Sequence, residues 1–259
     1  MSTLFLVATP IGNLSDISSR ALETLRSVDL IACEDTRHTI KLLNHFGIQK
    51  PLESYHDFNE EHKSRQLAER ISAGLKVAIV SDAGMPAISD PGYRIVRSCR
   101  EKGIPVIAIP GPSAAITALA ASGLPSDEFL FVGFLPAKAG ARREKLNTLR
   151  NVTATMVFYE APHRIEETLT DLQTAFGDRQ SCVARELTKV HEEYIFGKLS
   201  TVKERVKPLG EFVVIVEGGQ GDEEPQINLE GLSRKEILKV LAEKTGISKN
   251  TLYDLLLKD

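Results

Sequence analysis

The residues best suited to chemistry follow the ends of short apolar runs in the first half of the chain. Four of these runs are followed by segments rich in glycine, proline and acidic residues, at 9–13, 34–37, 81–92 and 110–113. Carboxylates there could bind cations or accept protons, and glycines let a backbone approach a ligand closely. Any single segment is explained equally well as an ordinary turn, because turns favour the same residue types. Four such segments in one register favour a ligand-binding cleft.

The apolar runs are predicted to be parallel strands that alternate with helices. We expect strands at 4–9, 30–35, 51–56, 77–82 and 105–110, and helices at 18–26, 36–46, 59–73 and 92–102. Short apolar strands separated by helices indicate βαβ units and a parallel sheet. Ligands bind at the carboxyl ends of the strands in such sheets. The four segments would therefore meet at one edge of the sheet.

The second half of the chain has a different rhythm and predicts a mixed sheet. We expect strands at 129–135, 154–160, 181–187, 192–199 and 212–217, and helices at 113–122, 142–149 and 163–176. The third and fourth of these strands are close enough to form a hairpin. The chain is thus predicted to be an α/β protein with two α/β domains, 1–112 and 113–219, and a cleft between them. An acidic linker (220–232) and a small helical hairpin (233–259) would follow.

Composition excludes several classes of protein. Hydrophobic residues make up 42% and charged residues 26% of the 259 residues, as in an ordinary globular chain. No apolar stretch approaches the roughly 18 residues of a membrane span, and no Lys or Arg precedes Arg20, as a secretory signal would require. The three cysteines lie far apart and the six histidines lack ligand spacing. We therefore expect a cytoplasmic protein with neither disulfides nor a metal site.

Charge leaves nucleic-acid binding open as a local property only. The 32 basic and 35 acidic residues give a net charge of −3, so a basic footprint over the whole chain is absent. The segment 136–150 is locally basic and could contact an RNA backbone or simply be a solvated helix face; its candidates are Lys138, Arg142, Arg143 and Lys145. No G-x-G-x-x-G follows the first strand, and neither a phosphate-binding loop nor a G-x-S-x-G turn occurs. Nucleotide-phosphate binding and serine hydrolysis are therefore disfavoured.

Several longer segments, in this order along the chain, resemble one known family. They are Thr9–Leu14, Glu34–Arg37, Ser81–Pro86, Asp90–Gly92, Pro110–Ala114, Gly133–Pro136, Phe158–Glu160 with His163–Arg164, and Ala184–Lys189. Together they resemble the ribosomal small-subunit RNA methyltransferase I family, bacterial enzymes of the tetrapyrrole-methylase fold that methylate a cytidine ribose 2′-hydroxyl in 16S rRNA. The resemblance covers about residues 4–219. Met85 departs from it, since a threonine is expected there.

The resemblance implies S-adenosylmethionine as methyl donor, bound in the cleft between the two domains of a homodimeric enzyme. Carried over by position, Pro10, Ile11 and Gly12 would line the cleft floor. Asp82, Ala83 and Met85 would contact the amino-acid part of the donor. The remaining implied donor-binding residues are Ser113 and Ala114 at a helix start, and Tyr159, Ala184 and Arg185 from the second domain.

The acceptor side of the reaction leaves more alternatives open. A ribose hydroxyl attacks better when a base accepts its proton, and the candidates are Asp35, Asp90, Glu160 and Glu186. Catalysis carried largely by positioning, without an obligate base, is also an alternative. Arg37 could hold a phosphate beside the target, as could Arg185.

Two other functions compete with this interpretation. The same fold could methylate a carbon of a porphyrinoid, although the basic segment 136–150 and the extra C-terminal tail argue against it. A non-enzymatic nucleic-acid binder could use the hairpin 233–259, because helix-turn-helix proteins read DNA with such hairpins. The segments at the strand ends argue against this last alternative.

Overall fold

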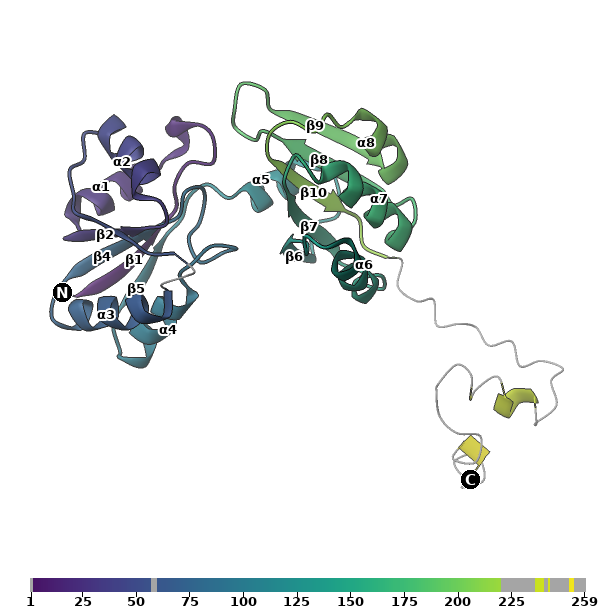
Figure 1. Ribbon diagram of the computed structural model, residues 1–259, viewed down its shortest axis with the longest axis horizontal. Coiled ribbons are helices and arrows are strands. Elements are labelled where there is room, and N and C mark those ends of the chain that lie inside the picture. The colour runs from purple at the N-terminus through teal and green to yellow at the C-terminus, as the bar shows by residue number, and fades with distance from the viewer. Residues whose placement is uncertain (1, 57–59, 220–235, 240–241, 243–251, 254–259) are drawn as a thin grey trace. The chain divides into compact units, whose positions relative to one another are not determined.

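The computed structural model describes residues 2–56, 60–219, 236–239, 242 and 252–253 (Figure 1). The chain divides into two units, Met1–Gly219 and Gln220–Asp259. Both predicted α/β halves belong to the first unit, so the boundary at 112 remains a prediction. The predicted linker 220–232 lies outside the described residues. Most of the predicted hairpin 233–259 does too, and of its described residues 236–239 are helical.

The first half contains a five-stranded parallel sheet, which confirms the predicted βαβ pattern. Its strands lie in the order β3-β2-β4-β1-β5. The bounds are Thr3–Val7 for β1, Leu30–Cys33 for β2, Leu52–Ser54 for β3, Lys76–Val80 for β4 and Val106–Ile109 for β5. Because all paired strands are parallel, the segments that follow them meet at one edge of the sheet.

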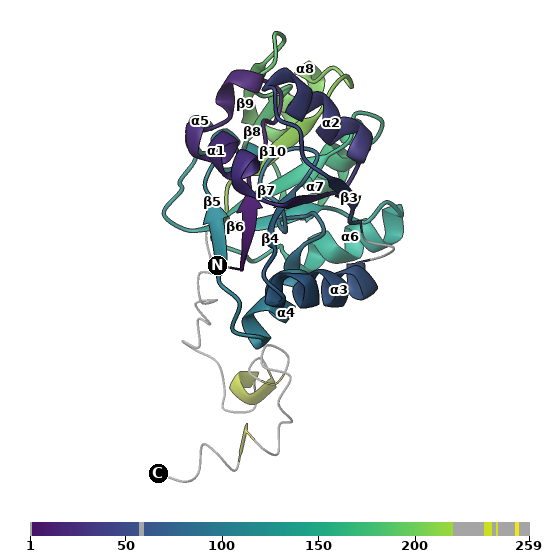
Figure 2. The ribbon, with the colours of Figure 1, turned by 90° about the vertical axis from the view of Figure 1, so that its left-hand side faces the viewer.

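Helices cover both faces of this sheet, as Figures 1 and 2 show. They are α1 (Ser19–Ser27) and α2 (Thr36–His45) on one face, and α3 (Glu60–Ser72) and α4 (Tyr93–Glu101) on the other; a short 3-10 helix, Leu14–Asp16, precedes α1. Leu25 and Leu43 pack with Ile31 under α1 and α2. Leu67 and Ile95 pack with Leu4 under α3 and α4. The central strands are buried on both faces, which explains their continuous apolar sequences.

The second half contains a mixed five-stranded sheet, again as predicted. Its strands are β6 (Phe129–Phe134), β7 (Thr155–Glu160), β8 (Gln180–Arg185), β9 (Glu193–Lys198) and β10 (Phe212–Val216). They lie in the order β6-β7-β10-β8-β9. Only β6 and β7 are parallel; the remaining pairs are antiparallel, including the predicted hairpin of β8 and β9.

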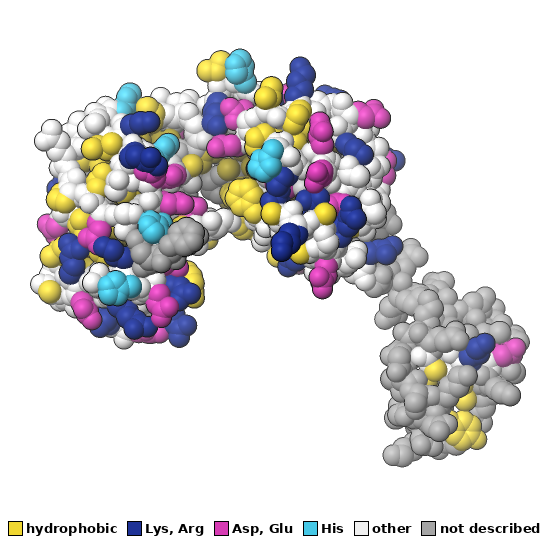
Figure 3. Space-filling view, viewed as in Figure 1, with side chains coloured by type: hydrophobic (Ala, Val, Ile, Leu, Met, Phe, Trp, Pro, Cys, Tyr) yellow, Lys and Arg dark blue, Asp and Glu magenta, His cyan; other side chains and the backbone are white. Residues whose placement is uncertain are grey.

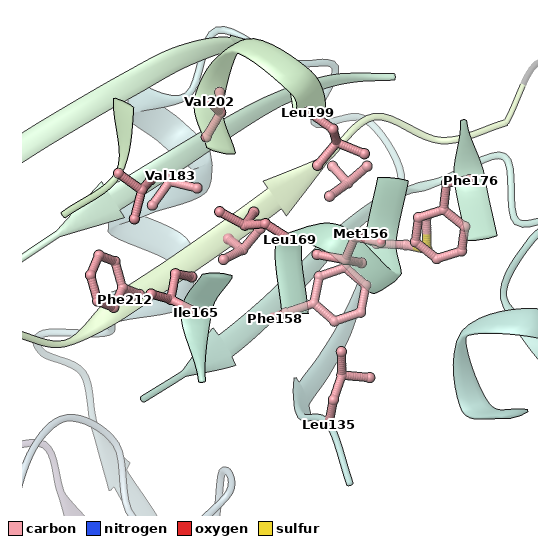
Figure 4. Close-up of a cluster of buried hydrophobic side chains, with 14 of the residues drawn as sticks. Leu135, Met156, Phe158, Ile165, Leu169, Phe176, Val183, Leu199, Val202 and Phe212 are labelled. Carbon is pink, nitrogen blue, oxygen red and sulfur yellow. The ribbon is translucent and has the colours of Figure 1, made fainter. Parts of the chain in front are cut away.

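The two faces of the second sheet have different neighbours. One face packs against α6 (Ala139–Thr148), α7 (Ile165–Phe176) and α8 (Leu199–Arg205), and Figure 4 shows this core. The other face packs against α5 (Ala114–Ala121). Residues of β10 alternate between the two, with Val214 in the first core and Ile215 in the second. Helix α8 was not predicted from the sequence, and its first residue, Leu199, fell within the predicted strand 192–199.

Candidate functional site

The segments after β1 and β4 are joined into one structure. The Thr9 N–H donates to the Gly84 carbonyl over 2.9 Å, and the Gly84 N–H donates back to the Thr9 carbonyl over 3.1 Å. The buried Thr9 hydroxyl also donates to the Ser81 carbonyl, at 3.1 Å. Gly84 has a φ of +84°, a conformation that favours glycine. These bonds hold two of the four predicted segments together.

These segments form one wall of a cavity, and residues from the second sheet form the other. Its volume is about 530 Å³, within the range of small-molecule sites. Figure 3 shows the surface hollowed between the two halves, with hydrophobic side chains on the wall. Seven of the predicted donor-binding residues line the cavity: Ile11, Asp82, Ala83, Met85, Ser113, Ala114 and Tyr159.

The other four predicted donor-binding residues lie beside the cavity and are not among its lining residues. Ala184 is fully buried under α5, and the Arg185 guanidinium is 3.0 Å from the Glu193 carboxylate. Pro10 and Gly12 belong to the segment after β1. A Cβ at Gly12 would lie 2.6 Å from Lys189 Cγ. Gly12 therefore allows the backbones of the two halves to meet.

Two of the four candidate bases are engaged away from the cavity. Asp35 caps α2 and forms an ion pair of 2.7 Å with Arg37, which is 88% exposed. Hydrogen bonds from Arg37 lower the pKa of Asp35 to about 2. Glu186 forms an ion pair with Lys189 at 2.9 Å, and this bond is the main reason its pKa is lowered. Neither carboxylate lines the cavity, and both are weak bases at neutral pH.

The other two candidates, Glu160 and Asp90, line the cavity but differ in their surroundings. The Glu160 carboxylate is buried and accepts from the Arg164 guanidinium at 3.0 Å and the Thr168 hydroxyl at 2.6 Å. It therefore anchors the start of α7. The negative charge of Asp90 acts on the hydroxyl of Tyr159, another lining residue. Burial raises the pKa of Tyr159, a hydrogen bond from the Ala115 backbone lowers it, and the Asp90 charge raises it further.

The cavity wall is acidic. Glu34, Asp82, Asp90 and Glu211 line it together with Glu160, whereas the described lining residues include neither Lys nor Arg. Asp82 Oδ1 accepts from the Asp35 N–H at 3.2 Å, which fixes that carboxylate at the cavity edge. A wall of this kind suits a cationic ligand and repels phosphate groups.

Residues 81–92, between β4 and α4, form a loop along the cavity, here called the cavity loop, and its far end is held by a buried network that was not predicted from the sequence. Glu60 Oε1 accepts from the Gly92 N–H at 3.0 Å and from the Tyr55 hydroxyl at 3.2 Å. Tyr55 is 2% exposed, and burial raises its pKa strongly. Ala87 and Ser89, inside this loop, have φ of +69° and +61°. Such conformations cost about 1–3 kcal/mol each and cluster at functional sites. Glu60 lies in a segment whose sequence predicts only a helix, so the sequence does not indicate that its carboxylate holds the cavity loop.

Other lining residues were not predicted either. Phe134 and Leu187 lie in segments that carry the family resemblance, and Ile88 and Ser89 lie inside the 81–92 segment, so their positions were available as a signal. Phe212 and Val213 line the cavity from β10. Their sequence indicates only a buried strand, so pattern alone could not assign them.

Of the predicted RNA contacts, Arg142 requires a correction. It is 2% exposed, because its Nε donates to Asp171 at 2.7 Å in a buried ion pair between α6 and α7. The prediction that it contacts RNA is wrong. Arg143 is 66% exposed and pairs with the other oxygen of Asp171 at 2.8 Å. Lys138 and Lys145 are exposed.

The described residues contain neither a metal-binding cluster nor a membrane-spanning helix. The part of the chain that the structure describes contains no group of three His, Cys, Asp or Glu side chains that could bind a metal ion. Within the same residues, no helix is long and apolar enough to cross a membrane.

Comparison with known proteins agrees with this architecture. Residues 3–203 match the family of tetrapyrrole (corrin/porphyrin) methylases. The chain is 46% identical to ribosomal RNA small subunit methyltransferase I of Synechocystis sp., over 100% of this chain and 98% of that protein. It is 48% identical to the protein of the same name from Xylella fastidiosa, over 97% of each chain. The Escherichia coli O157:H7 protein of that name is also 48% identical, over 96% of this chain and 93% of its own length.

Solved structures are similar at lower identity. A diphthine synthase has a TM-score of 0.63 at 18% identity, over 83% of this chain and 90% of its own. Uroporphyrin-III-C-methyltransferase from Thermus thermophilus has a TM-score of 0.56 at 19% identity, over 83% and 94%. Such likenesses show the fold and not the substrate. The matches along nearly the whole chain show more: the chain belongs to the ribosomal RNA small subunit methyltransferase I family, methyltransferases of the tetrapyrrole-methylase fold.

Proposed function

We propose that this chain transfers a methyl group from S-adenosylmethionine to the ribose 2′-hydroxyl of a cytidine in the 16S rRNA of the small ribosomal subunit. The observation that carries the proposal is the 46% identity to a protein of that name along 100% of this chain. Such a match includes the segments that line the cavity and those that lie outside it.

The residues present fit the proposed donor. S-adenosylmethionine carries a sulfonium and an ammonium cation, and Asp82 and Asp90 provide negative charge on the cavity wall. Ile11, Ala83 and Met85 provide apolar surface beside these carboxylates. Ser113 lies at the start of α5 without using its side chain as a cap, so its hydroxyl remains available. We assign the ammonium group to Asp82.

The donor, when bound, supplies an electrophilic methyl group, so the protein has to position and activate the acceptor oxygen. Asp90 is the candidate base that the site supports best, because it lines the cavity, whereas Asp35 and Glu186 do not and the Glu160 carboxylate is bound by Arg164 and Thr168. It would accept the proton of the ribose hydroxyl as that oxygen attacks. Tyr159 would narrow the cavity on the side opposite Ala83. The walls from the two halves would limit the access of water to the cavity, which strengthens the electrostatic effects of Asp82 and Asp90 there.

RNA phosphates must stay outside the acidic cavity, so we place backbone contacts on exposed cations around it. Lys138 precedes α6, and Arg143 and Lys145 lie further along this helix, which follows the cavity residue Phe134 closely in sequence. Arg37 is exposed at the start of α2. Arg97 and Arg100 are exposed on α4, which directly follows the cavity loop. These contacts would hold a nucleotide that is unpaired or turned out of its helix.

We further propose that the enzyme is a cytoplasmic homodimer. The edge strands β5 and β6 leave apolar side chains exposed, such as Ile107 at 37% and Phe129 at 43%. Ile116 on α5 is 50% exposed. Unpaired apolar edges favour association, and a second copy of this chain would cover them. Light scattering of the purified protein measures the mass directly, and a monomer at micromolar concentration would contradict this part of the proposal.

The experiment that tests the function offers radiolabelled S-adenosylmethionine with three acceptors in parallel. These are small subunits lacking the modification, naked 16S rRNA and a porphyrinoid mixture. We expect label in the RNA that nucleoside mass spectrometry identifies as 2′-O-methylcytidine. Label on the macrocycle alone would instead support the porphyrinoid function of the same fold, and an absence of label on every acceptor would contradict both.

A further inference from the structure

The edge strand β6 contains a bulge directly beside the cavity. Phe131 pairs with Val157, Gly133 with Phe158 and Phe134 with Tyr159, so Val132 is the extra residue. Gly133 has a φ of +72°, and a Cβ there would lie 3.0 Å from the Ser89 hydroxyl. The bulge therefore needs glycine both for its conformation and for the close approach of the cavity loop.

The bulge decides which way Phe134 faces. In a regular strand, residues three apart point to opposite faces of the sheet. Because Val132 is skipped, Phe131 and Phe134 both lie on the face of Tyr159, with ring centroids 5.1 and 5.5 Å from its ring. This is the face that the cavity occupies, and Phe134 is one of its lining residues. Bulges beside active sites often redirect a side chain in this way.

Phe134 combines a fixed position with an exposed surface. Its edge-to-face contact with Tyr159, at an interplanar angle of 62°, restrains the ring on one side. Its side chain is nevertheless 59% exposed, although it lines the cavity. Ile88 lines the same cavity at 51% exposure, and its neighbour Ser89 lies against Gly133. An aromatic ring and an aliphatic side chain thus form an exposed apolar surface at the cavity rim.

The chemistry of this surface selects a flat, uncharged ligand. Phosphates are disfavoured by the carboxylates of the cavity wall, whereas a nucleobase carries no charge and stacks on aromatic rings. The chain has no Trp, so stacking must use Phe, Tyr, His or Arg, and the described lining residues of these types are Phe134, Tyr159 and Phe212. We infer that Phe134, with Ile88 beside it, is a nucleobase-binding site that stacks the base of the nucleotide to be methylated. This inference rests on the proposed function and specifies how the acceptor is held.

The test compares Phe134→Ala with Phe134→Tyr in methyl transfer to small subunits. Loss of one aromatic–base stack lowers kcat/KM by roughly five- to a hundredfold, whereas the tyrosine variant keeps a ring and stays near the parent. The affinity for S-adenosylmethionine, measured separately by calorimetry, is expected to change less than about twofold in both variants, because the site assigned to the donor leaves Phe134 out. The matched control is Phe196→Ala, which removes a ring of 50% exposure on β9 that is not among the lining residues.

Each result separates the inference from the proposed function. If the parent enzyme methylates RNA and the kcat/KM of Phe134→Ala equals that of Phe196→Ala, the base-stacking site is overturned and the proposed function remains intact. Weakened donor binding in Phe134→Ala would also overturn it, because the ring would then pack against the donor. A parent enzyme that methylates no RNA would contradict the proposed function itself.

Discussion

At the scale of single residues, the carboxylates near the cavity differ in what surrounds them. Asp35 is paired with Arg37, and the Glu160 carboxylate is buried among donors from the start of α7. Those two donors bind Oε2, and the Ala161 N–H donates to Oε1 at 2.9 Å, so both oxygens of Glu160 are committed to structure. Asp82 and Asp90 both line the cavity but have different neighbours. The Asp82 carboxylate accepts a hydrogen bond from the backbone after β2, whereas burial and, to a smaller extent, the charge of Asp90 raise the pKa of Tyr159. This difference leads to two separate expectations.

Replacement of Asp90 is expected to affect the chemical step. Asp90→Asn removes the proposed proton acceptor while keeping the side-chain shape, so the single-turnover rate on small subunits should fall by about 10²–10⁴-fold. Donor affinity should change by only a few fold. Asp35→Asn is the control, because Asp35 lies outside the cavity lining. An Asp90→Asn rate equal to that of the parent enzyme would exclude Asp90 as the base.

Replacement of Asp82 is expected to affect donor binding instead. Asp82→Asn retains an oxygen that can accept from the Asp35 N–H but removes the charge. A charged hydrogen bond contributes about 1.5–3 kcal/mol, so the Kd for S-adenosylmethionine should rise roughly 10- to 100-fold in calorimetry. The control is Asp16→Asn, which removes the same charge from a residue on the exposed 3-10 helix. Equal Kd values for the two variants would show that the ammonium group lies elsewhere.

At the scale of elements, helix α6 shows how one basic segment serves two purposes. Arg142 faces the core and pairs with Asp171 on α7, whereas Lys138 and Lys145 face solvent. Asp171 is itself buried, at 4% exposure. Burial raises its pKa, but hydrogen bonds from Arg143 and Arg142 lower it more, so the net shift is downward. The ion pair thus fixes α6 to α7 and leaves the other cations of the segment exposed.

Removal of Asp171 is expected to destabilise the protein strongly. Asp171→Ala leaves the Arg142 guanidinium buried with only the exposed Glu167 beside it, which costs about 3–5 kcal/mol in urea unfolding. Arg143→Ala, which removes the exposed partner, should cost under about 1 kcal/mol.

The contribution of Asp171 to the free energy of unfolding is expected to depend on pH. Because the folded-state pKa of Asp171 is lowered, this contribution is present above the ordinary carboxyl range and is lost as the pH falls through the lowered value. The difference in unfolding free energy between the parent and Asp171→Asn should therefore shrink in acid, and a difference that stays constant with pH would contradict the ion pair.

The exposed lysines of the same segment are expected to act through electrostatics alone. Lys138→Ala combined with Lys145→Ala should weaken RNA binding and reduce the slope of log affinity against log salt by about one per lysine. Stability in urea and donor affinity should remain those of the parent. An unchanged salt slope in filter binding would remove this segment from the RNA-binding surface.

At the scale of the first unit, the cavity exists because two sheets approach each other at a few backbone positions. Gly12, after β1, lies against the Leu187–Lys189 segment that follows β8. Glu186 and Thr188, on either side of Leu187, both have positive φ, so this segment is held in a strained conformation. The position of Leu187 in the cavity wall thus depends on contact between residues far apart in the chain.

A side chain at Gly12 is expected to separate these segments. In Gly12→Ala the new Cβ would lie 2.8 Å from the Leu187 carbonyl oxygen, so backbone must shift and donor binding should weaken at least about tenfold, with a loss of stability of about 1–3 kcal/mol. Gly140→Ala is the matched control, since nothing lies within 4 Å of its Cβ and the helix favours alanine. Identical calorimetric and urea-unfolding results for the two variants would contradict a role for Gly12 at this contact.

The sequence by itself determined the parallel sheet, the mixed sheet and most of the loops that line the cavity. Periodicity reveals strands such as β4, and parallel strands bring the segments after them to one edge, so Ile11 and Asp82 could be placed in advance. These features depend on local pattern and on a rule of topology. The resemblance to a family added the second wall of the cleft through Tyr159.

Only the tertiary structure decided which side chains face inward. Arg142 and Lys145 lie on one short helix with similar neighbours in sequence, yet a carboxylate 29 residues away from Arg142 buries one of them. Phe134 faces the cavity because β6 skips a residue against β7, which no alternation pattern reveals. Glu60 anchors the cavity loop from another helix. Each outcome depends on contacts between distant segments, and local propensity carries no information about them.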